Sequence, residues 1–368
     1  MSSFETEISQ YTRQIKRYPN DYMAYIRRGV VYYNHQQNER AIQDFNRAIT
    51  LNPNLAVAYN NRGFTYKRLG QYERAIQDYD KAIELNPNYA DAYNGRGLAY
   101  KDLKRYTWAI VNLDKAIELN PNDASAYYNR GKIYFALYEY ERAIQDYGKT
   151  IEFYPNFAPA YYDRGIVYSK LGQFKPQTAD FSKAIELNPY YIEAYVGRGI
   201  AYSIFGPYEQ AIQDLNKAIE LNPKEDAEAY RWRGATYAEL KQYNQAIQDF
   251  KKAIQLDPND EYKYYDLGEA YYELGQYDLA IQAFDTVIEL YPDNYYVYNC
   301  RGFFYYSKLK QYERAIRDFN KAIQLEPEAP ASYEMRGECY QALGYNSKAK
   351  ADFAKVKQLG GVLKSDNY

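Results

Sequence analysis

Hydrophobic and polar positions along this chain repeat with a period close to 34 residues. In residues 58–87, AYNNRGFTYKRLGQYERAIQDYDKAIELNP, small and apolar positions return every three or four residues on both sides of the turn LGQ. This spacing places them on one face of a helix, so the segment predicts two helices joined by a short turn. The second helix ends at Asn-Pro, because proline lacks an N–H for the helix ladder and restricts the residue before it.

Prolines precede each copy of this pattern, at intervals of 34 or 35 residues: Pro19, Pro53, Pro87, Pro121, Pro155, Pro189, Pro223, Pro258, Pro292 and Pro327. A glycine recurs in the first helix of each copy: Gly29, Gly63, Gly97, Gly131, Gly165, Gly199, Gly234, Gly268, Gly302 and Gly337. We therefore expect ten copies over residues 22–361, which form one domain. A single helix precedes them within residues 1–21, and residues 362–368 form a short tail.

The recurring glycine predicts a close helix crossing. Helices pack about 8–10 Å apart, and the side chains at the crossing set that distance. A glycine inside a helix costs about 0.5–1 kcal/mol relative to alanine, so ten returns of it indicate a packing requirement. We expect the second helix to cross the first at the glycine, with a small residue such as Ala75 or Ala109 facing it.

Comparison of the copies predicts an ion pair between the two helices of each repeat. The residue before the glycine is arginine in nine copies, and an aspartate usually precedes the second aromatic position of the second helix. The copy with Leu267 in the arginine position is also the copy with Ala283 in the aspartate position. A half-buried ion requires its partner, which favours a pair. The alternative is that both are unpaired surface charges.

Two helices and a proline at this period resemble the tetratricopeptide repeat (TPR) family. The second copy carries every position on which the resemblance rests: Tyr59, Gly63, Tyr66, Ala75, Tyr79, Ala82 and Pro87. The resemblance covers nearly the whole chain. It implies an all-α solenoid, a right-handed superhelix of antiparallel helix pairs in which the first helices line the concave side. Each pair is stable only against its neighbours, because one hairpin cannot bury both of its faces.

The resemblance also implies which residues line the groove: those three before the glycine and one, four and five after it. Copies two to four place mainly polar and basic residues there: Asn60, Lys67, Arg68, Asn94, Lys101, Tyr128 and Lys132. Copies five and six place uncharged residues there: Tyr162, Ile166, Val196, Ile200 and Ser203. Copies seven to nine add acidic and aromatic residues: Arg231, Glu239, Tyr265, Glu269, Tyr272, Glu273, Phe303 and Tyr306. Such a gradient would orient a peptide or helix of complementary charge. The alternative for any single residue is that it does not bind a partner: a tyrosine would only cover neighbouring helices, and a charged side chain would only face solvent.

Charge and chemistry narrow the function. The chain has 46 basic and 48 acidic residues, a formal charge of −2, so no global field attracts nucleic acid or a membrane. Its histidine is His35 and its cysteines are Cys300 and Cys339, without metal spacing or a nucleophile–base set. We expect no catalysis, no cofactor and no metal. So few cysteines exclude a disulfide framework, and the sequence lacks a signal peptide or an apolar run of about 18 residues; we expect a cytoplasmic protein.

The sequence thus predicts a non-enzymatic interaction scaffold or adaptor that binds a peptide segment or helix of another protein. A clamp for the C-terminal carboxylates of heat-shock chaperones, known in this family, is excluded because Asp91 and Asp163 stand where it needs cations. One alternative is a homo-oligomeric scaffold or assembly chaperone that self-associates through the C-terminal end, at Phe353 and Leu359. Another is a groove for an anionic ligand or RNA around the early lysines. Gln177, where alanine is expected, leaves open a hinge in the fifth copy.

Overall fold

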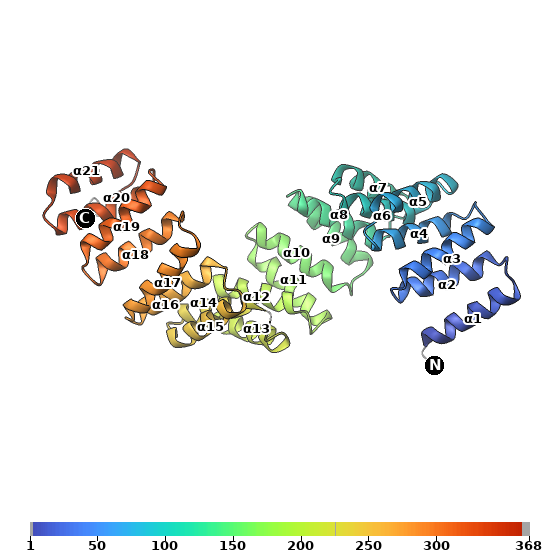
Figure 1. Cartoon of the computed structure of the whole chain (residues 1–368), viewed down its shortest axis with the longest axis horizontal. Coiled ribbons are helices and arrows are strands. Elements are labelled where there is room, and N and C mark those ends of the chain that lie inside the picture. Colours follow the sequence, from blue (N-terminus) through green and yellow to red (C-terminus); the bar gives the residue numbers. More distant parts are fainter. Residues whose placement is uncertain (1–2, 225, 363–368) are drawn as a thin grey trace. The chain divides into compact units, whose positions relative to one another are not determined.

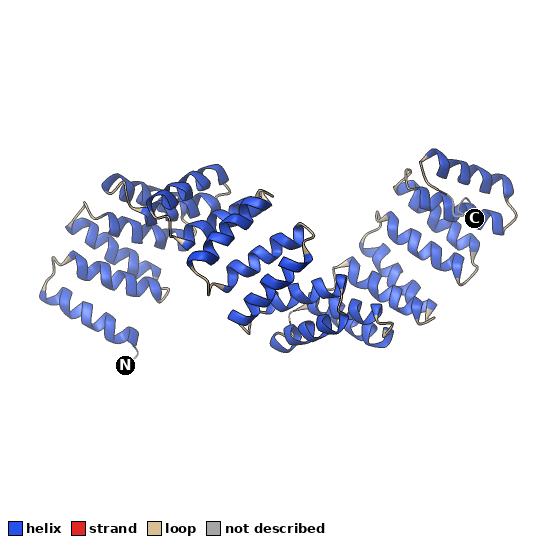
Figure 2. Ribbon diagram, turned by 180° about the vertical axis from the view of Figure 1, so that it is seen from behind, coloured by secondary structure: helices blue, strands red, loops and turns tan. Residues whose placement is uncertain are grey.

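The computed structural model describes residues 3–224 and 226–362, and this part of the chain consists of helices without strands (Figure 2). A single helix, α1 (Ser3–Arg17), comes first. Ten helix pairs follow: α2 (Tyr22–Asn34) with α3 (Asn38–Leu51), α4 (Ala56–Arg68) with α5 (Tyr72–Leu85), α6 (Ala90–Asp102) with α7 (Tyr106–Leu119), α8 (Ala124–Ala136) with α9 (Tyr140–Phe153), α10 (Ala158–Lys170) with α11 (Phe174–Leu187), α12 (Ile192–Phe205) with α13 (Tyr208–Leu221), α14 (Ala227–Glu239) with α15 (Tyr243–Leu256), α16 (Glu261–Glu273) with α17 (Tyr277–Leu290), α18 (Tyr295–Ser307) with α19 (Tyr312–Leu325), and α20 (Pro330–Ala342) with α21 (Asn346–Gln358). The predicted all-α solenoid is confirmed.

The helices group into two compact units, one that ends at Pro189 and one that begins at Tyr190. Within each unit, the second helix of one pair packs against the first helix of the next (Figure 1). The boundary follows α11, whose sequence departs from the other copies. Pro176 lies in the first turn of α11, where its missing N–H has no intrahelical partner to lose, and Gln177 is buried without interrupting the helix.

In most pairs a ring of the second helix lies closer to the recurring glycine than the small residue that we expected there; at Gly97 the expected Ala109 does face the glycine, with its carbonyl oxygen 3.2 Å from the place of a Cβ. A Cβ on Gly63 would lie 2.9 Å from Cε1 of Tyr79, in the second helix of the same pair. Phenylalanine rings occupy the equivalent place in other pairs, such as Phe181 beside Gly165. These rings are almost completely buried. Glycine is therefore required because a large side chain of the second helix lies against the backbone of the first; it is aromatic in most pairs and is Leu113 or Leu215 beside Gly97 and Gly199.

The predicted ion pair between paired helices is confirmed. In α4 and α5, Arg62 Nε donates to Asp78 Oδ2 at 2.7 Å and Nη2 donates to Oδ1 at 2.6 Å. The same two-bond geometry recurs in seven further pairs: Arg28–Asp44, Arg130–Asp146, Arg164–Asp180, Arg198–Asp214, Arg233–Asp249, Arg301–Asp318 and Arg336–Asp352. Arg96 donates instead to Asn112 Oδ1 at 2.6 Å. The planar fork of arginine matches the two oxygens of a carboxylate.

The remaining guanidinium nitrogen, Nη1, reaches the preceding pair. Arg62 Nη1 donates to Asn46 at 2.6 Å, and Arg130 Nη1 donates to Asp114 at 2.6 Å. One arginine therefore ties three helices together. Arg164 makes no such bond within the described structure, because the acceptor position of the preceding pair is Gly148. A Cβ there would have Arg164 Nη1 as its nearest neighbour, at 3.8 Å.

Replacing Arg62 or Asp78 with alanine is expected to lower the free energy of unfolding by about 2 kcal/mol, because each leaves a charge without its partner. The double replacement is expected to cost clearly less than the sum. Chemical denaturation followed by circular dichroism measures all three values. Lys81→Ala, which removes one side of the exposed pair with Glu84, is the control and should cost less than about 0.5 kcal/mol. Additive losses would show that the guanidinium and carboxylate do not interact.

Gly148→Asp is expected to stabilise the protein by about 1 kcal/mol, because it removes a helix glycine and gives Arg164 Nη1 an acceptor. Gly148→Val is the matched control, since valine has a helix propensity close to that of aspartate but no acceptor. The difference between the two denaturation midpoints measures the new bond. A valine variant as stable as the aspartate variant would contradict the proposed role of this position.

Candidate functional site

Five of the predicted groove residues meet at one pocket of the second unit. The pocket has a volume of about 360 Å³ and is lined by three successive first helices, α16, α18 and α20. We call it the aromatic pocket; its lining is Tyr265, Glu269, Tyr272, Glu273, Tyr296, Asn299, Cys300, Phe303, Phe304, Ala331 and Met335.

The rings of the aromatic pocket are held in place by the chain itself. Tyr272 stacks on Phe304 with ring centroids 4.1 Å apart and planes at 15°, and its hydroxyl lies 3.1 Å from Oγ of Ser307. The hydroxyls of Tyr265 and Tyr296 lie 3.3 Å apart. Burial raises the pKa of Tyr265, so this side chain is neutral at every physiological pH. Aromatic surface fixed in advance loses little side-chain freedom when a partner binds.

A second pocket of about 370 Å³ lies next to the first and shares Glu269 and Glu273 with it. We call it the acidic pocket; its lining is Ala235, Ala238, Glu239, Lys241, Tyr243, Phe250, Asp266, Glu269, Ala270 and Glu273. Burial raises the pKa of Glu269, and the nearby carboxylates of Glu273 and Asp266 raise it further. Arg231, a predicted groove residue, donates from Nε to Asp266 Oδ2 at 2.8 Å and so belongs to the framework of this pocket.

The aromatic pocket lies where the repeated packing pattern is interrupted. Val287 of α17 and Val297 of α18 occupy positions that hold alanine in the second copy, Ala82 and Ala58. Both valines are buried, and α17 and α18 pack less closely than the helices at other junctions within either unit. Larger side chains at a helix contact increase the interaxial distance. The two valines therefore account for the wider junction beside the pocket.

The predicted residues of the first unit are engaged by their own chain. Lys67 and Lys101 each lie 3.5 Å from a carboxylate oxygen of Asp102. The guanidinium carbon of Arg68 lies 3.6 Å from the ring centroid of Tyr33, and its Nη1 donates to the carbonyl oxygen of that residue. This part of the wall is consequently less basic than the sequence predicts.

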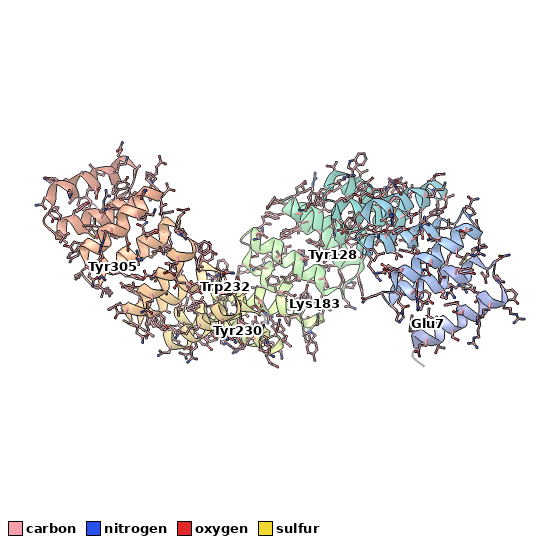
Figure 3. The ribbon with its side chains drawn as sticks, viewed as in Figure 1. Glu7, Tyr128, Lys183, Tyr230, Trp232 and Tyr305 are labelled. Atoms are coloured by element: carbon pink, nitrogen blue, oxygen red, sulfur yellow. The ribbon has the colours of Figure 1, made fainter. Side chains whose placement is uncertain are left out.

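The polar residues predicted in the first unit also have partners. Asn60 and Asn94 are buried and donate to Tyr89 and Ser125, respectively. Tyr128, labelled in Figure 3, donates to Asp163 Oδ2 at 2.7 Å.

Three other predicted residues lie apart from the two pockets. Tyr162 packs on Phe181, with centroids 5.7 Å apart, and Lys132 is exposed. Tyr306 lies on α18, where burial and a hydrogen bond with Glu338 raise its pKa to about 12.

Sequence reasoning missed part of the pocket lining. Asn299 stands three residues before Gly302, as Asn60 stands before Gly63, so the positional rule was sufficient to find it. Cys300 and Met335 stand two residues before their glycines, a position that the rule leaves out.

The chain belongs to the tetratricopeptide repeat family. The family model described as TPR repeat matches residues 29–70, 97–137, 131–172, 206–241 and 234–275, which together exceed half of the chain. Models described as tetratricopeptide repeat match residues 56–89, 262–294, 78–111, 283–317 and 158–191. Proteins of this family are generally scaffolds for protein interactions, and the fold is typically non-catalytic. The search of curated proteins gave no match.

Several solved structures resemble parts of the chain. The C-terminal part of a TPR repeat-containing protein from Cytophaga hutchinsonii is 20% identical, with 66% of this chain and 99% of that chain covered and a TM-score of 0.54, a likeness of fold. YrrB, described as a TPR protein with an unusual peptide-binding site, is 28% identical, with 49% and 92% covered and a TM-score of 0.45. MamA is 30% identical, with 46% and 92% covered and a TM-score of 0.42.

Reactive groups in the described residues are few. No cluster of histidine, cysteine and carboxylate side chains suited to a metal ion occurs there, and no helix among them is long and apolar enough to cross a membrane. Nδ1 of His35 lies 2.9 Å from the carbonyl oxygen of Val31. Burial raises the pKa of the Cys300 thiol to about 12, and that of Cys339 to about 12 as well. A thiol reacts as its thiolate, so both are poor nucleophiles at neutral pH.

Alkylation of Cys300 by iodoacetamide at pH 8 is expected to be at least about 100-fold slower in the folded protein than in urea, because so little thiolate is present. The folded rate should rise about tenfold per pH unit up to the raised pKa. Peptide mapping by mass spectrometry reads Cys300 and Cys339 separately. Rapid modification of folded Cys300 that levels off near pH 8.5 would contradict the raised pKa.

Proposed function

We propose that this chain is a non-catalytic interaction scaffold that holds a peptide segment or a helix of another protein against the first helices of its second unit. The observation that carries the proposal is the aromatic pocket, which gathers Tyr265, Tyr272 and Phe303 from two first helices. Tyrosine and other aromatic residues are enriched among the residues that dominate binding energy at protein interfaces. Ordered rings around a pocket of this size fit the side chain of a partner.

The chemistry of the described residues supports a role without catalysis. The thiol of Cys300 is protonated at neutral pH because burial raises its pKa to about 12. His35 lies in the first unit, whereas both cysteines lie in the second. Neither cysteine forms a disulfide, and free thiols are typical of a reducing compartment; we therefore place this interaction in the cytoplasm.

The alternatives to a protein partner in this groove have less support. An anionic ligand or RNA in the first unit would require several free cations around Lys67, Arg68, Lys101 and Lys132. Lys67, Lys101 and Arg68 are engaged by the chain itself, and Lys132 is exposed. Self-association through the C-terminal end would use Phe353, whose ring lies against Gly337 of its own pair. The first helices of the second unit, α16 and α18, therefore offer the better binding surface.

Replacing Tyr265, Tyr272 and Tyr306 together with alanine is expected to abolish capture of the partner from an extract of the source cells. Each replacement removes aromatic surface from the wall of first helices, and truncation of such an anchor typically costs about 2 kcal/mol or more. Quantitative mass spectrometry compares the proteins captured by wild type and variant, and circular dichroism confirms that the variant folds.

Trp108→Ala is the matched control for this capture, because Trp108 is 61% exposed and lies on α7, a second helix. It removes a large aromatic side chain without touching the groove. An unchanged set of proteins with the triple variant, or loss of the partner with Trp108→Ala, would overturn the proposed location.

A further inference from the structure

The two pockets of the second unit differ in chemistry but share a wall. Glu269 and Glu273 line both and stand four residues apart on α16, which places them about one helical turn apart on the same face. On one side of them lie the tyrosine and phenylalanine rings, and on the other lie further carboxylates. A segment that crosses this wall meets both surfaces within a few residues, since an extended chain advances about 3.3 Å per residue.

The acidic pocket has more negative than positive charge. Of its four carboxylates, Asp266 is paired with Arg231. Glu239, Glu269 and Glu273 form no ion pair with any lysine or arginine of the described chain, and Lys241 is the basic residue in the lining. Burial is the main cause of the raised pKa of Glu269, and the neighbouring carboxylates of Glu273 and Asp266 also raise it by repulsion. A cation placed between them would relieve that repulsion.

The aromatic pocket has an unused hydrogen-bond acceptor. Oδ1 of Asn299 is buried and accepts no hydrogen bond within the described structure. A buried acceptor without a donor is costly, and this one belongs to the pocket lining.

We propose that the two pockets together receive one segment of a partner protein in which a lysine or arginine lies close to an aromatic or large aliphatic residue. The basic side chain enters the acidic pocket between Glu269 and Glu273, and the apolar side chain packs on the rings of Tyr272 and Phe303. This inference rests on the proposed function and adds the chemistry of the partner. Complementary charge selects the partner and fixes its direction along the wall, whereas the aromatic contact provides most of the affinity.

Selection from a phage library of random peptides of about 12 residues tests the proposal, since a groove of this kind reads short linear segments. Peptides selected on the wild-type protein are expected to be enriched in lysine or arginine within four residues of phenylalanine, tryptophan, tyrosine, leucine or methionine. The best of them, made synthetically and labelled with fluorescein, then gives dissociation constants by anisotropy.

Glu269→Gln and Glu273→Gln are each expected to weaken binding of that peptide about tenfold, which corresponds to about 1.4 kcal/mol. Glu328→Gln is the matched control: it removes the same charge from an exposed residue of the second unit outside both pockets and should leave the affinity within about twofold. Replacing the basic residue of the peptide with glutamate should abolish binding, and Glu273→Lys should restore part of it.

The outcomes separate this inference from the proposed function. One outcome would be that the selected peptides lack basic residues but lose binding with Tyr272→Ala or Phe303→Ala. This result would contradict a basic residue in the partner and would still agree with the proposed binding groove. Basic peptides weakened equally by Glu328→Gln would show attraction to net charge alone, which also overturns it. Failure to select any peptide whose binding depends on Tyr272 or Phe303 would overturn both.

Discussion

The structure depends on one guanidinium per repeat that is bonded to two neighbours at once. Two of its nitrogens hold the aspartate of the paired helix, as Arg62 holds Asp78, and the third reaches the preceding pair, as Arg62 reaches Asn46. A buried arginine is tolerated only when its donors are satisfied. Most hairpins are consequently tied to their own second helix and to the hairpin before them by the same side chain; within the described residues, Arg164 lacks the bond to the preceding pair, and the repeat with Leu267 lacks both bonds.

The repeat that lacks this arginine contributes four lining residues to each of the two pockets. In α16 and α17 the two positions hold Leu267 and Ala283, both buried. An apolar pair replaces a buried ion pair at little cost, because no charge has to leave water. The cation of α16 is Lys263, which is held by Asp257 and Asp260. Lys263 therefore does not neutralise the carboxylates of α16 that line the acidic pocket, and this pocket remains negatively charged.

The repetition of the sequence made the fold and the internal ion pairs predictable, because ten copies reveal which positions vary together. The aromatic ring beside most of the glycines was not predicted, since periodicity shows which face a residue occupies but not which atom approaches it. The positional rule names five of the residues that line the aromatic pocket, Phe303 among them. It does not foresee contacts between repeats: Asp102, which engages Lys67, lies 35 residues further along the chain.

The acceptor that each arginine uses in the preceding pair has a consequence for how such chains change length. Asparagine or aspartate stands in that place in several repeats, as at Asn46, Asp80, Asp114 and Asn320. If a whole hairpin is lost or duplicated between two such repeats, the arginine of the following repeat still has an asparagine or aspartate acceptor in the repeat before it. The array can therefore grow or shrink in whole hairpins during evolution. The eighth repeat, with Leu267 where the others offer a cation, still presents Asp285 to the arginine of the repeat that follows it.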